Sequence, residues 1–114
     1  MYELVSVIFP FADDAHKGKP RPGFVVSPPF GLYKQVIVVY VTTQTEDISE
    51  TDIILDPSEQ YFETTGLLEK SIIKLHRLAT FQPNALKEGQ GSLPEELIPE
   101  LKKKLLQVFQ IEKI

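Results

Sequence analysis

The chain of 114 residues contains no cysteine, so it has neither a disulfide framework nor a thiolate metal site. It also lacks any apolar run near the roughly 20 residues that a membrane-spanning helix needs. Its first residues lack the basic segment, the apolar stretch and the small-residue cleavage site of a secretion signal. We therefore expect a cytoplasmic protein that makes no contact with a membrane.

The motifs of several large enzyme classes are missing as well. The chain has no G-x-G-x-x-G dinucleotide motif, no P-loop and no G-x-S-x-G nucleophile motif. Its two histidines, His16 and His76, lack the spacing of zinc ligands. The acidic stretch from Glu46 to Asp52 lacks the glycine and the ligand spacing of a calcium loop, so we expect a solvated loop there. The sequence thus indicates no metal and no cofactor.

Positive charge is scarce, since the formal net charge is −4. A protein that tracks a phosphate backbone over a wide surface is usually basic, so any contact with nucleic acid must be local or strengthened by oligomerisation. The dense basic patch of the first half consists of Lys17, Lys19 and Arg21. A second basic cluster, 102–104, is expected on the solvated side and last turns of a helix, where cations suit the helix dipole.

Short apolar segments predict a small β protein. The chain is 42% hydrophobic and 25% charged, which is typical of one globular domain, expected to span residues 1–114. Segments rich in β-branched and aromatic residues are expected to form strands at 4–9, 24–27, 35–42, 52–55 and 71–75, the last preceded by 66–68. The continuous apolar run 36–41 indicates a central strand covered on both sides. No long helical pattern separates these strands, which favours a small β-barrel or curled sheet.

The last quarter of the chain predicts a helix packed on the sheet. Residues 92–95 read Ser-Leu-Pro-Glu, the pattern of a helix capping box. Pro99 lacks a backbone donor and should kink or divide the helix. Spacings of three and four residues place an apolar set on one helix face: Leu97, Ile98, Leu101, Leu105, Val108 and Phe109.

Arg21 stands between Pro20 and Pro22 where a polar loop leads into an apolar segment. The prolines hold the backbone extended and remove backbone donors. The guanidinium is always charged and offers five donors in a planar fork, which suits a phosphate or a carboxylate. Taken alone, the arrangement suits equally well a surface arginine at the start of a strand.

The central strand ends in polar residues. Thr42, Thr43 and Gln44 are common turn formers, and they are also short donors that could meet a phosphate beside an arginine. His16, in the loop before Arg21, is either solvated or an acid or base near neutral pH. His76 is expected on the strand face that carries residue 74.

The order of these features resembles the PemK/MazF-like toxins of bacterial type II toxin–antitoxin systems, over almost the whole chain. The resemblance is carried by the segments 9–11, 19–22, 24–27, 41–44 and 71–80. It implies a mainly β fold, an SH3-like small β-barrel of the CcdB/PemK/MazF-like kind with a C-terminal helix. It also implies a homodimer.

The resemblance further implies a metal-independent endoribonuclease that cuts single-stranded RNA. In that reaction the ribose 2′-hydroxyl attacks phosphorus and leaves a 2′,3′-cyclic phosphate, and a cognate acidic antitoxin silences the toxin. The family's catalytic arginine falls on Arg21 and its catalytic threonine on Thr42. His16 is our candidate for the acceptor of the 2′-hydroxyl proton. We expect further RNA contacts from Lys17, Lys19, Thr43, Gln44 and Arg77.

Two alternatives stay open at this point. A CcdB-like toxin would bind and poison a protein target, with residues 108–111 as the docking segment, although these residues suit core packing better. An inactive relative would act only as a binding protein. Incubation with a long RNA in EDTA identifies the nuclease by its discrete fragments. Intact RNA together with growth arrest would favour target poisoning, and the absence of both cleavage and toxicity would indicate the inactive relative.

Overall fold

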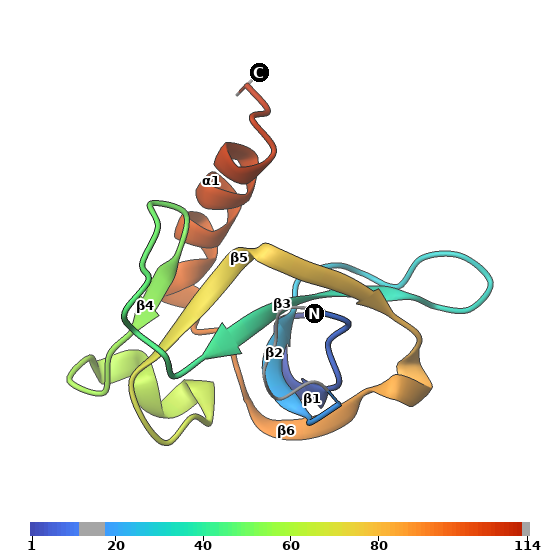
Figure 1. Cartoon of the computed structure of the whole chain (residues 1–114), viewed down its shortest axis with the longest axis horizontal. Helices are drawn as coiled ribbons and strands as arrows, with labels where there is room; N and C mark the ends of the chain where they lie inside the picture. Colours follow the sequence, from blue (N-terminus) through green and yellow to red (C-terminus); the bar gives the residue numbers. More distant parts are fainter. Residues whose placement is uncertain (12–17, 113–114) are drawn as a thin grey trace.

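The computed structural model describes residues 1–11 and 18–112, which form one curled antiparallel sheet with a helix at the C-terminal end (Figure 1). The sheet has six strands in the order β4-β5-β3-β2-β1-β6. The mainly β fold with a C-terminal helix is therefore confirmed. The strands are β1 (Glu3–Val7), β2 (Arg21–Val25), β3 (Val36–Thr42), β4 (Ile53–Leu55), β5 (Ser71–Phe81) and β6 (Lys87–Ser92).

Apolar clusters cover β3 on both faces, as its continuous apolar run predicts. Val39 and Val41 pack with Phe24 in the cluster that also contacts the C-terminal helix. Val38 and Tyr40 belong to a second cluster, which includes Val5, Val7, Phe9 and Val25. We call the side of the sheet that carries this second cluster the aromatic face.

β5 is more than twice as long as expected and sharply bent (Figure 1). In its pairing with β3, Val39 lies opposite Leu78 but the next residue, Tyr40, lies opposite Lys74. The three residues 75–77 of β5 therefore have no partner on β3 in the described ladder. Extra residues of this kind bend a strand and redirect its side chains. The bend redirects two polar side chains, those of His76 and Arg77.

β6 is a strand that the sequence did not predict. Its residues read Lys-Glu-Gly-Gln-Gly-Ser, without apolar alternation, and it forms by pairing with β1. The segment 66–68 precedes β5 as expected and follows the 3₁₀ helix η1 (Gln60–Thr65), which ends at Gly66 with φ of 74°. η1 lies against β6, and a Cβ on Gly91 would come within 2.3 Å of the Thr65 carbonyl oxygen. Glycine at this position lets the two backbones touch.

The C-terminal helix begins later than its sequence pattern predicts. Ser92 ends β6, and the 3₁₀ helix η3 (Glu95–Leu97) has no side-chain cap. The predicted capping box at 92–95 is therefore wrong. The helix α1 (Ile98–Val108) carries Pro99 in its first turn, after the 3₁₀ segment, which confirms the predicted division. Leu97 and Leu101 are buried as expected. No helix among the described residues is long and apolar enough to cross a membrane.

The docking segment at 108–111 divides between core and surface. Val108 packs partly against the core, which agrees with the packing interpretation. Phe109 is 57% exposed and Ile111 is 55% exposed, so the core-packing expectation is wrong for these two side chains.

Replacement of Gly91 by alanine should destabilise the fold, because the new methyl group would overlap the Thr65 carbonyl and push β6 from η1. We expect a loss of about 2 kcal/mol in the free energy of unfolding, measured by urea titration. Glu88→Ala, on the exposed part of the same strand, is the control and should change little. Equal unfolding midpoints for the two variants would contradict this account.

Candidate active face

The structure brings Arg21 and Thr42 to neighbouring strand ends. On β2 and β3, Gly23 lies opposite Tyr40. Arg21, the first residue of β2, stands two residues before Gly23, and Thr42, the last residue of β3, stands two residues after Tyr40. Residues two apart on a strand share a sheet face, so both side chains lie on the face that carries Tyr40. The two predicted catalytic residues therefore lie on one face, at the ends of adjacent strands.

Arg21 lies on the aromatic face of the sheet. It pairs with Val7 of β1, a member of the aromatic-face cluster, and opposite residues share a face. The Arg21 side chain is half-buried, and its Nε has no hydrogen-bond partner among the described residues. A buried donor without an acceptor costs about 1–3 kcal/mol. An anion that supplies an acceptor would remove this cost.

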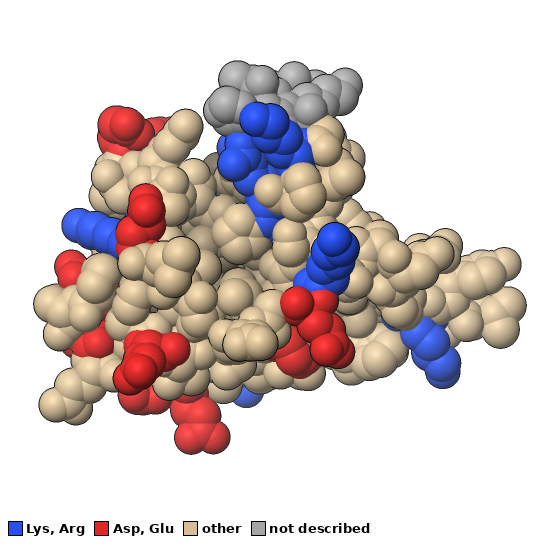
Figure 2. All heavy atoms as spheres, turned by 90° about the horizontal axis from the view of Figure 1, so that it is seen from below, with Lys and Arg blue, Asp and Glu red and all other residues tan. Residues whose placement is uncertain are grey.

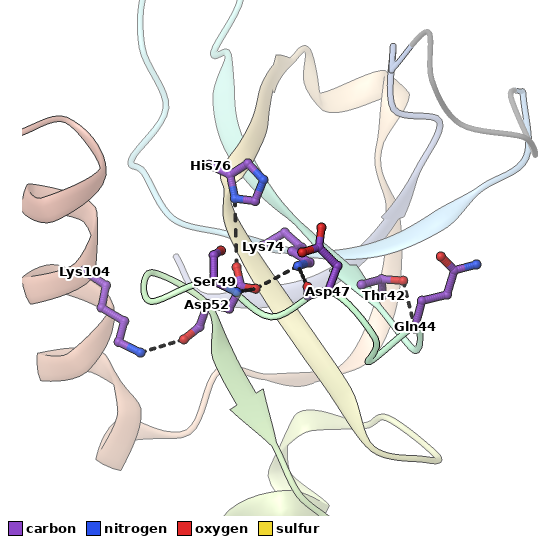
Figure 3. A network of polar contacts seen from close by, with 8 residues as sticks. All are labelled: Thr42, Gln44, Asp47, Ser49, Asp52, Lys74, His76 and Lys104. Atoms are coloured by element: carbon purple, nitrogen blue, oxygen red, sulfur yellow. Dashed lines mark hydrogen bonds and ion pairs between the residues drawn. The ribbon is translucent and has the colours of Figure 1, made fainter.

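Thr42 is half-buried, and its hydroxyl has one defined contact (Figure 3). The backbone N–H of Gln44 donates to Thr42 Oγ1 at 3.1 Å. Because the oxygen acts as an acceptor here, its own proton stays available for donation. Thr43 and Gln44 follow β3 as exposed residues, and exposed Lys19 precedes β2, so these candidates flank the Arg21/Thr42 pair along the chain. His16 and Lys17 lie outside the described residues.

Arg77 lies over two aromatic rings. Its Cζ is 4.3 Å from the ring centroid of Phe11 and 4.9 Å from that of Tyr40. Phe11 in turn stacks on Phe9, with centroids 5.1 Å apart and an interplanar angle of 21°. Tyr40 meets both phenylalanine rings edge-on. The bend in β5 thus places a guanidinium on the aromatic face.

A buried ion pair anchors β5 to the loop before β4 (Figure 3). Lys74 Nζ donates to Asp52 Oδ2 at 2.8 Å, and it also donates to the carbonyl of Asp47. The expectation of a solvated acidic loop is therefore wrong for Asp52, which is 3% exposed. The reason is the lysine within the buried strand, which needs an acidic partner.

Further contacts converge on Asp52. The backbone N–H of Ser49 donates to Asp52 Oδ2 at 2.8 Å, and Lys104 Nζ donates to the Asp52 carbonyl at 2.6 Å. Lys104 also forms an ion pair with Glu100 at 3.2 Å. The predicted solvated position holds for Lys102 and Lys103, but Lys104 is half-buried and ties α1 to this loop. His76 Nδ1 lies 3.9 Å from Asp52 Oδ1, on the Lys74 side as expected.

The environment of Asp52 lowers its pKa. Burial on its own would raise the pKa of this carboxyl, but hydrogen bonds from Lys74 and Ser49 outweigh that effect. The carboxylate is therefore the form that the fold stabilises.

Charge on the surface is unevenly distributed. Figure 2 shows one compact group of basic side chains near the top of the view, while acidic side chains are scattered over the left and centre. The net charge of −4 is thus compatible with a local basic region.

Several solved structures with the same fold come from mycobacteria. One, an endoribonuclease in complex with its cognate antitoxin from a mycobacterial species, is 15% identical with a TM-score of 0.68, over 99% of this chain and 96% of that chain. The Mycobacterium tuberculosis toxin MazF-mt6 is 17% identical with a TM-score of 0.68, over 96% of this chain and 98% of that chain. No match is found among curated protein sequences.

These likenesses define the class as a MazF-like β domain with a C-terminal helix. The family model described as PemK-like, MazF-like toxin of type II toxin–antitoxin system matches residues 2–109. The chain belongs to this toxin family.

Replacement of Lys74 by methionine should destabilise the protein by about 3 kcal/mol, because it leaves the buried Asp52 carboxylate unpaired. Urea unfolding at neutral pH measures the loss. The double variant Lys74→Met/Asp52→Asn removes the uncompensated charge and should recover part of the stability. If the single variant is as stable as the wild type, the ion pair does not anchor β5.

The lowered pKa of Asp52 predicts a dependence of stability on pH. A carboxyl whose pKa is lower in the folded state contributes stability above its ordinary value of 3.8 and loses it as the pH falls through the folded-state pKa. We expect the wild-type urea midpoint to fall more steeply below about pH 4 than that of Asp52→Asn. Parallel curves for the two proteins would contradict the assignment.

Proposed function

We propose that the protein is a metal-independent endoribonuclease, the toxin of a type II toxin–antitoxin pair, that cuts single-stranded RNA. The observation that carries the proposal is the β2/β3 register, in which Arg21 and Thr42 belong to the same sheet face on adjacent strands. Membership of the PemK/MazF-like family supports it. So do two solved structures of the same fold that are named endoribonucleases.

The proposed reaction needs no metal or cofactor. The ribose 2′-oxygen forms a bond to phosphorus, the bond from phosphorus to the 5′-oxygen breaks, and a proton passes from the 2′-hydroxyl to the leaving oxygen. The products are a 2′,3′-cyclic phosphate and a 5′-hydroxyl. DNA lacks the 2′-hydroxyl and is not a substrate.

Arg21 and Thr42 have distinct proposed roles. Negative charge builds on the non-bridging oxygens in the transition state, and the Arg21 guanidinium stabilises it. Arginine stays protonated and is a poor base, but it can supply a proton to the leaving oxygen. The Thr42 hydroxyl positions the phosphate by donating to it. His16 stays the predicted acceptor of the 2′-hydroxyl proton.

We also propose a cytoplasmic homodimer that is silenced by a cognate acidic antitoxin. The likeness to an endoribonuclease solved with its cognate antitoxin supports such a partner. An acidic segment would complement the cations of the aromatic face, Arg21 and Arg77, with exposed Lys19 close by in the chain. RNA and antitoxin would then compete for the same side chains.

Replacement of Arg21 by alanine should lower the rate of RNA cleavage at least about a hundredfold, because removal of one such donor costs about 3 kcal/mol in the transition state. The assay incubates a long RNA with protein in EDTA and follows discrete fragments by gel. Thr42→Val should cause a smaller loss. Lys103→Ala, an exposed change on α1, is the control and should cleave as the wild type does.

Three outcomes decide among the candidate functions. Fragments that persist at the wild-type rate with Arg21→Ala would refute the site. Intact RNA with wild-type protein, together with growth arrest on expression, would favour a toxin that poisons a protein target, for which exposed Phe109 and Ile111 offer a surface. Intact RNA without growth arrest would indicate an inactive binding protein.

A further inference from the structure

We propose that the Arg77 guanidinium is a stacking plate for a nucleobase next to the cleaved phosphate, and that Phe11 and Tyr40 hold it in place. The inference rests on the proposed function, since it requires RNA to cross the aromatic face. It gives Arg77 a role in reading a base, beyond a general charge contact.

The first support is the position of the Arg77 guanidinium over two aromatic rings. Arg77 Cζ lies 4.3 Å from the centroid of Phe11 and 4.9 Å from that of Tyr40. The Phe11 ring is itself fixed by stacking on Phe9, which is buried against the sheet. A long arginine side chain normally loses much rotational freedom when it binds, and a seat of aromatic rings reduces that loss.

The second support is the position of this seat beside the proposed reacting residues. Tyr40 stands two residues before Thr42 on β3 and shares its face, which separates them by about 7 Å along the strand. The Phe9 ring covers Gly23, which lies opposite Tyr40 and two residues after Arg21. The plate therefore adjoins the Arg21/Thr42 pair along both strands.

The third support is the chemistry of the group. Single-stranded RNA is recognised largely by bases that stack on aromatic rings or on guanidinium planes. A phosphate contact needs only a charged group in solvent, such as the exposed Lys19. A half-buried arginine set on two rings presents a plane as well as a charge, and lysine cannot replace it in that role.

The test separates stacking from charge through Arg77→Lys, which keeps the charge and removes the plane. The cleavage site is first mapped on a long RNA. A fluorescent RNA of that sequence is then made with a 2′-deoxy nucleotide at the cleaved position, so that it cannot react. Two further RNAs carry an abasic nucleotide on one side or the other of that position, and anisotropy gives the dissociation constants.

With wild-type protein, one of the two abasic RNAs should bind about tenfold more weakly than the complete RNA. With Arg77→Lys, the complete RNA should bind about tenfold more weakly, and the abasic change should have almost no further effect. Phe11→Leu, which keeps Arg77 but removes its ring, should reduce the abasic penalty as well. Lys103→Ala, the charge control on α1, should keep the full wild-type penalty. Urea unfolding shows whether each variant is folded.

The inference is overturned if folded Arg77→Lys keeps the wild-type penalty for the abasic RNA, or if neither abasic RNA binds wild-type protein more weakly. Cleavage of unmodified RNA, measured in parallel, keeps the two proposals apart. If RNA is cleaved but Arg77→Lys still binds the abasic RNA more weakly than the complete RNA, by the wild-type factor, the stacking role of Arg77 is refuted and the nuclease function stands. If wild-type protein cuts no RNA, the nuclease is refuted, and the anisotropy comparison is made instead with a single-stranded homopolymer RNA with and without one abasic nucleotide. Weaker binding of the abasic homopolymer to wild-type protein but not to Arg77→Lys would then retain the stacking role of Arg77.

Discussion

The register between β2 and β3 is the constraint on which the proposed site depends. It is fixed where Gly23 meets β3, since a Cβ at this position would lie 2.6 Å from Val38 Cγ1 and 2.7 Å from the Val39 carbonyl oxygen. Only glycine allows this close approach, which the Phe9 ring then covers. A slip of one residue would reverse the face of every side chain on one strand and separate Arg21 from Thr42.

The bend in β5 is the second device that shapes the aromatic face. Lys74 is held before the bend by its ion pair with Asp52, and Leu78 pairs again with β3 after it. Between these two fixed points the strand has three residues more than its partner. The surplus turns Arg77 onto the rings of Phe11 and Tyr40. The ion pair of Lys74 with Asp52 thereby fixes one end of the bend that carries Arg77.

The sequence predicts the elements whose signals are local. The apolar run of β3, the prolines around Arg21 and the polar end at Thr42 are each visible within a few residues, and the structure puts Arg21 and Thr42 on one face of adjacent strands. β6 has no such signal, because its polar residues form a strand only through pairing with β1. The burial of Asp52 also escapes prediction, since its partner Lys74 is 22 positions away. A lysine among apolar strand residues was the available hint.

Because the net charge is negative, we expect RNA binding to depend on a few well-placed guanidinium groups. A chain of net charge −4 cannot gain affinity from a broad cationic field. Phosphate contacts also make binding sensitive to salt: for single strands, each contact contributes about −0.7 to the slope of log affinity against log salt concentration. Stacking and hydrogen bonds do not carry this dependence. The prolines on either side of Arg21 restrain its backbone, and the rings of Phe11 and Tyr40 hold the Arg77 guanidinium before any ligand arrives. A few cations that are held in place before binding can therefore do what a more basic protein does with many.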